Sequence, residues 1–192
     1  MSRSMKGVSI AVGLFLLGAC NKSFLTSHPV AVAGATLADS AGRVIGTASL
    51  WQEADGIVHV DVEVTCAAGG ACTALTPGEH GIHFHSVASC VAASSPAFSS
   101  AGGHYNPLSK QHGLNNALGP HAGDAPNLTV GADGRGKASF TTDRVTITSG
   151  ATSLFDADGS SIVIHGGADD QMSQPAGNSG ARVACGVVKT VP

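Results

Sequence analysis

The stretch IVHVDVEVT, residues 57–65, alternates between apolar and polar side chains from Val58 onward. Valine occupies positions 58, 60, 62 and 64, and a polar residue follows each of them. Successive side chains of a β-strand point to opposite faces, so this pattern predicts a strand with one buried face and one solvent face. Half-buried strands of this kind are typical of antiparallel sheets.

Similar short segments lie on both sides of this strand. The pattern becomes strand-like from Ala31 onward, and strands are predicted at residues 44–53, 81–86, 137–143, 160–165 and 182–188. The turn sequences DSAGR, EADG and GADGRG separate several of these segments. Many short strands joined by turns rich in Gly and Asp predict an all-β fold, either a sandwich or a barrel.

The composition supports this fold class and limits the function. Charged residues make up 12% of the chain and glycine accounts for 26 of its 192 residues, a balance that disfavours long salt-bridged helices. The length fits one domain with a short leader. The net charge of -3 leaves no sequence-wide basic field for a nucleic-acid backbone, so no nucleic-acid partner is expected.

The N-terminus reads as a bacterial lipoprotein leader. Arg3 and Lys6 precede an uncharged run over 7–19, which is too short to span a bilayer well. The run ends in LGAC, which resembles a lipobox, so residues 1–19 would be removed and Cys20 would carry lipid. A chance cysteine after an ordinary signal peptide is the alternative. Cleavage would leave 8 basic and 13 acidic residues and a net charge of -5.

Four cysteines remain if Cys20 is lipid-modified. They are Cys66, Cys72, Cys90 and Cys185, and in an oxidising compartment they could form two disulfides with three alternative pairings, or a metal site. The flexible segment AAGGA between Cys66 and Cys72 favours a local bridge there and leaves Cys90 to pair with Cys185.

Two strand-free segments carry or follow most of the histidines. Residues 87–127 and 166–181 contain no strand or helix pattern, and loops of such length are usually functional or disordered. His83 and His85 lie two residues apart on a predicted strand and therefore share a face, although such a pair alone is more often not a metal site. Further candidates follow: His104, His112, His121, Asp124 and His165.

The chemistry of this set narrows the choice of metal. Imidazole nitrogen suits copper and zinc, and a single carboxylate among imidazoles argues against calcium or magnesium. The set contains no cysteine, which excludes a structural zinc finger.

Five segments in order resemble the copper, zinc superoxide dismutases: GIHFH, AGGHYNP, HGLNNALGPHAGDAPNL, IVIHGGADD and NSGARVACG, across residues 81–187. The resemblance implies a Greek-key β-sandwich or flattened barrel of immunoglobulin-like type, with two long functional loops. It implies an oxidoreductase that disproportionates superoxide to dioxygen and hydrogen peroxide, as an antioxidant defence.

The resemblance also implies a role for each matched residue. Copper would be bound by His83, His85, His104 and His165, and zinc by His104, His112, His121 and Asp124. His104 would bridge the metals and take part in proton transfer, and Asp169 would link His83 to His112. Arg182 would attract and orient the superoxide anion, and Cys90 would form a disulfide with Cys185. His28, His59 and His80 fall outside the motifs and are expected to be solvent-facing or structural.

The expected organisation is a signal peptide over 1–19, a lipidated cysteine and tether over 20–33, and the dismutase-like domain over 34–192. This arrangement places the protein in the cell envelope, facing the periplasm and anchored to a membrane through Cys20. The segment 166–181 contains no lysine, unlike the charged steering loop of eukaryotic members, and both a monomer and a homodimer remain open. The competing hypotheses are a copper-carrying lipoprotein on the same scaffold and a purely structural β-sandwich.

Overall fold

The computed structural model describes residues 28–65 and 75–191. Cys20, Cys66 and Cys72 lie outside the described residues, so the predicted lipid site and the predicted local disulfide are not among the features that follow. Within the described ranges, no helix is both long enough and apolar enough to cross a membrane.

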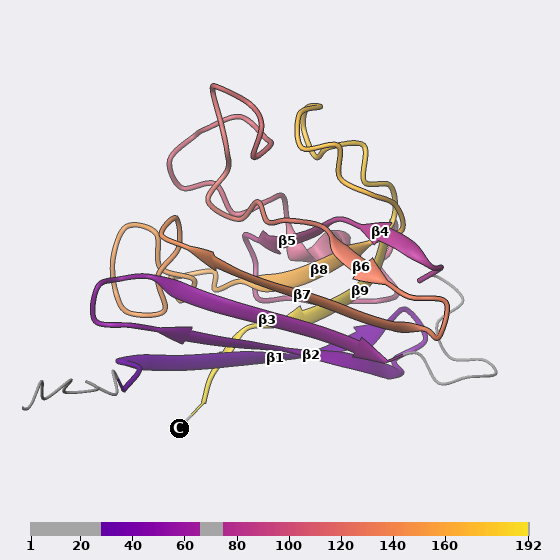
Figure 1. Ribbon diagram of the computed structural model, residues 1–192, viewed down its shortest axis with the longest axis horizontal. Helices are drawn as coiled ribbons and strands as arrows, with labels where there is room; N and C mark the ends of the chain where they lie inside the picture. Colours follow the sequence, from indigo (N-terminus) through magenta and orange to yellow (C-terminus); the bar gives the residue numbers. More distant parts are fainter. Residues whose placement is uncertain (1–27, 66–74, 192) are drawn as a thin grey trace, which may run out of the picture.

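Ten strands form one antiparallel sheet that curls into an almost closed barrel (Figure 1). The order of neighbours is β4-β6-β7-β3-β2-β1-β9-β8-β5, and β10 pairs with β1. The strands are β1 (Ala31–Asp39), β2 (Val44–Gln52), β3 (Val58–Thr65), β4 (Gly78–His80), β5 (Ile82–His85), β6 (Leu128–Val130), β7 (Arg135–Thr142), β8 (Ser161–His165), β9 (Arg182–Val187) and β10 (Lys189–Thr190). The expected all-β barrel or sandwich is confirmed.

The side chains of strand β3 alternate between buried and more exposed, as its sequence pattern predicted. Its four valines are each at most 2% exposed, and β3 lies between β2 and β7 in the sheet. The six predicted strands all form, with ends within two residues of the expected ones. Strand β1 begins at Ala31, so the fold starts three residues before the boundary expected at residue 34.

β4 and β5 do not pair with each other, and the barrel stays open between them. These strands stand at the two ends of the sheet order, yet only Gly81 separates them in the chain. Gly81 donates its N–H to the Gly167 carbonyl and accepts from His165, both at 2.8 Å. A Cβ at Gly81 would lie 2.8 Å from Ser179, so this close approach requires glycine.

Two long loops rise together on one side of the barrel, above β5 and β8 (Figure 1). The first covers 87–127 between β5 and β6 and contains one short 3-10 helix, η1 (Ser99–Ala101). The second covers 166–181 between β8 and β9. A disulfide between Cys90 and Cys185 ties the first loop to β9, as predicted.

We expect Leu50→Ala to lower the free energy of unfolding by about 2–5 kcal/mol, because Leu50 on β2 is fully buried and its loss leaves a cavity. Val44→Ala on the same strand is the matched control, since Val44 is 67% exposed and should change stability by about 0.5 kcal/mol or less. Urea unfolding of both variants measures the difference. Equal effects would contradict this assignment of the core.

Candidate metal centre

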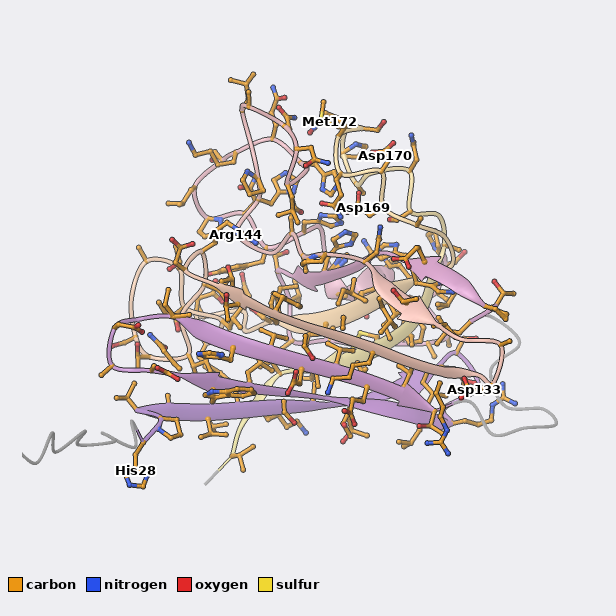
Figure 2. All side chains as sticks on the ribbon, viewed as in Figure 1. His28, Asp133, Arg144, Asp169, Asp170 and Met172 are labelled. Atoms are coloured by element: carbon orange, nitrogen blue, oxygen red, sulfur yellow. A yellow bond between two sulfur atoms is a disulfide. The ribbon has the colours of Figure 1, made fainter. Side chains whose placement is uncertain are left out.

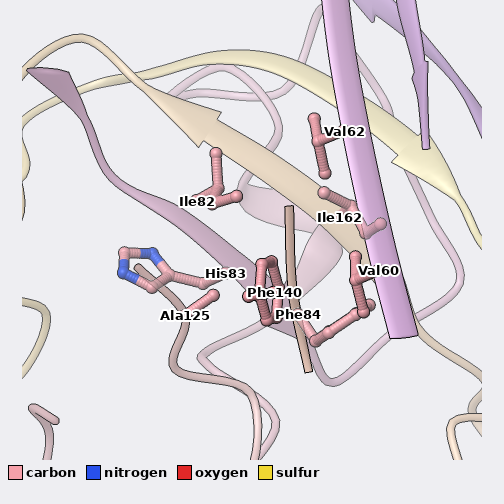
Figure 3. Close-up of a pocket in the computed structure, with 8 residues that line it drawn as sticks. All are labelled: Val60, Val62, Ile82, His83, Phe84, Ala125, Phe140 and Ile162. Atoms are coloured by element: carbon pink, nitrogen blue, oxygen red, sulfur yellow. The ribbon is translucent and has the colours of Figure 1, made fainter. Parts of the chain in front are cut away.

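Strand β5 carries His83 and His85, and its backbone positions the other candidate ligands. Ile82 and Phe84 point into the barrel, where they line a small apolar pocket, and the ring of His83 is directed away from the apolar side chains (Figure 3). The pocket is completed by residues from β3, β7, β8 and the first loop: Val60, Val62, Phe140, Ile162 and Ala125. The alternation of β5 therefore separates a hydrophobic face from an imidazole face.

The first loop pairs with the free edge of β5. Isolated antiparallel bridges join His83 to Asp124 and His85 to His104. The Phe84 N–H donates to Gly123 O at 2.9 Å, and the Phe84 carbonyl accepts from Tyr105 N at 2.8 Å. This backbone register brings residues that are distant in the sequence beside the β5 histidines.

Four imidazoles converge at this edge. One ring nitrogen each from His83, His85, His104 and His165 lies within 4.8 Å of all the others. These atoms are His83 Nδ1, His85 Nε2, His104 Nε2 and His165 Nε2, and each is buried with no hydrogen-bond partner. Buried polar atoms normally have a partner, so four orphaned nitrogens facing one point indicate a site for a cation.

The partners of the opposite ring nitrogens define the tautomers. His83 Nε2 donates to Asp169 Oδ2 at 2.7 Å, His85 Nδ1 to the Gly102 carbonyl at 3.0 Å, and His165 Nδ1 to the Gly180 carbonyl at 3.2 Å. A neutral imidazole carries one N–H, so the inward-facing nitrogen of each ring keeps its lone pair. The protein thus presents these rings in the form that binds a metal ion.

A second cluster gathers around the Asp124 carboxylate. Its Oδ1 lies 2.9 Å from His104 Nδ1, 3.0 Å from His112 Nδ1 and 3.2 Å from His121 Nδ1. Its Oδ2 accepts from the backbone N–H groups of Gly113 and His121, which fixes the carboxylate. His104 faces both clusters, through Nδ1 here and Nε2 in the first.

Asp169 joins the two clusters from the second loop, where it lies below Asp170 and Met172, toward the barrel (Figure 2). Its two carboxylate oxygens accept from His83 Nε2 at 2.7 Å and from His112 Nε2 at 3.0 Å. Asn127 holds the Asp169 backbone through bonds to both its N–H and its carbonyl. A Cβ at Gly177, which has φ of 64°, would collide with this carboxylate.

Two glutamines of the second loop hydrogen-bond to the backbone of the first loop, a contact that the sequence did not predict. Gln174 accepts from His112 N and donates to His112 O, both at 2.9 Å. Gln171 accepts from Leu114 N and donates to Ala125 O. The segment QMSQPAG has no periodicity that could have marked these glutamines in advance.

Two further side chains steady the backbone of the candidate ligands. His80 is 1% exposed, with its ring nitrogens 2.8 Å from the carbonyls of His165 and Thr76, so it is structural. Arg144, at the base of the loops in Figure 2, donates to the Asp124 carbonyl at 2.8 Å. Neither belongs to a pattern that predicts such a contact.

Arg182 lies beside the first cluster. It donates from Nη1 to the Phe98 carbonyl at 2.7 Å and from Nη2 to the Gly102 carbonyl at 2.6 Å. The Gly102 carbonyl is also the acceptor for His85, so Arg182 and His85 share one anchor. Its positive charge acts on His85 and His165 and disfavours their protonation.

Burial controls the protonation of the first cluster. Loss of hydration lowers the pKa of His83 to about 3 and that of His165 to about 4, and it holds the pKa of His85 well below the ordinary value. His112 behaves in the opposite way. Although burial lowers its pKa, the hydrogen bonds to Asp124 and Asp169 raise it to about 9.

The donor sets fit copper and zinc. The first cluster offers four imidazole nitrogens and no carboxylate, a set that suits a redox-active transition metal such as copper. The second combines imidazoles with one carboxylate in a closed arrangement typical of zinc. The orphaned nitrogens of the first cluster and the convergence on Asp124 Oδ1 in the second are the structural basis for this fit.

We expect the metal-free protein to lose stability as the pH falls from about 6.5 to about 4. His83 and His165 stay neutral there in the fold but become protonated in the unfolded chain, which then binds more protons. His112 is protonated in the fold throughout this range and also in the unfolded chain below about pH 5.5, so it adds no slope in the lower part of the range. His165→Gln should reduce the slope by about 1 kcal/mol per pH unit, measured by urea unfolding. An unchanged slope would contradict a buried neutral imidazole.

Comparison with known proteins identifies the family. The model of the copper/zinc superoxide dismutase family matches residues 44–188. A superoxide dismutase-like protein of Bacillus subtilis is 45% identical over 120 residues, which is 62% of this chain and 60% of that protein. The copper/zinc superoxide dismutase 2 of Aquifex aeolicus is 38% identical over 189 residues, covering 97% of this chain and 99% of its own length.

Solved structures agree with these sequence matches. The crystal structure of a SOD-like protein from Bacillus subtilis is similar, with a TM-score of 0.70 and 36% identity, over 80% of this chain and 96% of the other. The five segments singled out in the sequence lie within the matched range, and four of them supply both clusters. The chain therefore belongs to the copper/zinc superoxide dismutase family.

Proposed function

We propose that this chain is a superoxide dismutase, which converts two superoxide anions and two protons into dioxygen and hydrogen peroxide. The observation that carries the proposal is the set of four buried, unpartnered nitrogens at His83, His85, His104 and His165, beside the guanidinium of Arg182. The name of the Aquifex aeolicus relative, which spans nearly the whole chain, supports the same activity.

In this proposal His83, His85, His104 and His165 hold copper, and His104, His112, His121 and Asp124 hold zinc. When bound, copper supplies the one-electron redox cycle that the disproportionation needs, whereas zinc is redox-inactive. Asp169 positions His83 and His112 by accepting a hydrogen bond from each. Its displacement would therefore disturb both ligand sets.

His104 can carry a proton at a defined atom. Its Nδ1 faces Asp124, while its Nε2 faces the first cluster without a hydrogen-bond partner. Nε2 is thus the atom that can take up a proton and pass it to a reduced substrate, as a general acid does. Burial, which lowers the pKa of His104, favours release of that proton.

Arg182 supplies the local positive charge. Two backbone carbonyls fix its guanidinium next to His85, so an approaching anion meets a charge that is already oriented. The chain has a net charge of -3, so attraction must come from this side chain and the bound metals rather than from the whole protein.

We expect the metal-loaded protein to turn over superoxide, and His165→Ala to reduce turnover to that of free metal by removing one copper ligand. Arg182→Ala should reduce the rate about tenfold and weaken its dependence on salt, because local steering is lost. Stopped-flow decay of superoxide at low and high salt measures both effects.

Arg135→Ala is the matched control, since Arg135 is an exposed cation on β7 whose side chain is 73% exposed. It should leave turnover unchanged. Copper binding without turnover above the free-metal level would contradict the dismutase and favour a copper carrier.

We also propose that the mature protein begins at a lipid-modified Cys20 and works in the cell envelope, facing the periplasm. The supporting observation is the order of Arg3 and Lys6, the uncharged run and LGAC in the first twenty residues. The run is too short to serve well as a membrane span, which favours a cleaved leader.

We expect the wild-type chain, expressed in a bacterium that processes lipoproteins, to fractionate with membranes and to carry diacylglycerol on Cys20. Cys20→Ser should abolish both processing and lipid, because the thiol is the acceptor. Ser23→Ala leaves LGAC intact and is the control. Mass spectrometry of the N-terminal peptide is the measurement, and an unmodified Cys20 in the mature wild type would disprove the anchor.

A further inference from the structure

The outer face of strands β1 and β2 carries no charge. Both strands are described in full, and their exposed or half-exposed side chains are all apolar, hydroxyl-bearing or glycine. Asp39, the one carboxylate in β1, is 6% exposed and bound to Arg43. Because the chain has a net negative charge, a face without charged side chains meets less repulsion from another negatively charged surface.

Apolar side chains collect at one end of this face. Val32 pairs directly with Trp51 across β1 and β2, so both point outward on the same side. Val30, one residue before β1, extends the ladder by donating its N–H to Gln52 O. Val191 donates its N–H to Val32 O and lies against the outer side of Gly34.

These four residues, Val30, Val32, Trp51 and Val191, form what we call the valine face. Its three valines are 55%, 39% and 52% exposed, and Trp51 is half-buried. Contiguous exposed apolar groups of this kind usually mark a contact surface. The ring of Trp51 stacks on His59 with centroids 4.9 Å apart, which holds the indole in place.

The short segment between Cys20 and the start of the fold indicates that the partner of the valine face is a membrane. Only nine residues separate Cys20 from Val30, and even a fully extended chain over these ten residue-to-residue steps reaches about 33–36 Å. That is less than the span of a domain of this size, roughly 40 Å. A lipid on Cys20 therefore keeps the valine face, where the chain enters the fold, close to the bilayer.

The candidate metal centre lies on the other side. His28 marks the chain entry at the lower edge of the fold, whereas Asp169 lies in the second loop above the barrel (Figure 2). A bilayer against the valine face would thus leave the metal-binding loops in the aqueous phase, open to a small anionic substrate.

We propose that the valine face rests on the membrane surface in the anchored protein, an inference that depends on the lipid at Cys20 proposed above. Tryptophan and aliphatic side chains suit the interface between headgroups and acyl chains. Lys189 pairs with Gly34 on the same face and adds attraction to anionic headgroups. The carboxylate of Glu53, which lies near Trp51 in the chain, is 3.2 Å from His59 Nε2 and thus has a partner within the protein.

Trp51 is the one tryptophan of the chain and reports directly on this contact. The full lipidated protein is reconstituted into vesicles of phosphatidylethanolamine and phosphatidylglycerol, with or without brominated acyl chains, which quench a nearby indole. We expect brominated vesicles to reduce Trp51 emission at least twofold. Val32→Asp, and independently Val191→Asp, should remove most of the quenching while the protein still floats with the vesicles.

Val44→Asp is the matched control, because Val44 is an exposed valine on β2 outside the valine face. It should leave the quenching unchanged, and thermal unfolding of each variant verifies its fold. Flotation without quenching of wild-type Trp51 would overturn the membrane contact and leave the anchor intact. An unmodified Cys20 without flotation would disprove the anchor and this inference with it. A dimer in sedimentation that Val32→Asp dissociates, with Trp51 unquenched, would instead make the face a contact between two copies.

Discussion

The candidate metal centre depends on the free edge of strand β5. This strand stands at one end of the sheet order, so its outer backbone groups need partners from elsewhere. The first loop supplies them through bridges at Asp124 and His104. Since the bridging residues are themselves candidate ligands, the hydrogen bonds that satisfy the sheet edge also set the spacing of the imidazoles. The same backbone hydrogen bonds therefore complete the sheet and position the candidate ligands.

A second constraint acts on the side chains. The Asp169 carboxylate is buried, and burial alone would favour its neutral form. The N–H groups of His112 and His83 outweigh that effect and lower its pKa, so it stays charged and keeps both rings oriented. The glutamines of the second loop hold the His112 backbone in turn. Ring orientation therefore rests on a network drawn from both loops.

The sequence predicted those elements whose signal is local. Six strands could be located because each buries alternate or consecutive apolar residues over at least four positions, whereas β4 and β6 have only three residues each and show no readable period. The candidate ligands were found through the order of motifs in a resemblance, since spacing alone left the pair His83 and His85 ambiguous. The pairing of the first loop with β5 involves backbone groups distant in the chain, which no local pattern encodes. His80 was expected to be solvent-facing or structural, and its burial and carbonyl contacts show the structural case.

The second loop also explains how a negatively charged protein can attract an anion. Its segment 166–181 contains two carboxylates and no cation. Asp169 is committed to two imidazoles, and Asp170 accepts bonds from Met172 N, Ser173 N and the Asn178 amide within the same loop. The carboxylates of Asp169 and Asp170 both accept hydrogen bonds from nearby donors. The Arg182 guanidinium donates to neutral backbone carbonyls. The field at the first cluster therefore combines the fixed guanidinium of Arg182 with the carboxylates of Asp169 and Asp124, which contact ligand histidines. The positions of these charges matter more there than the net charge of the chain.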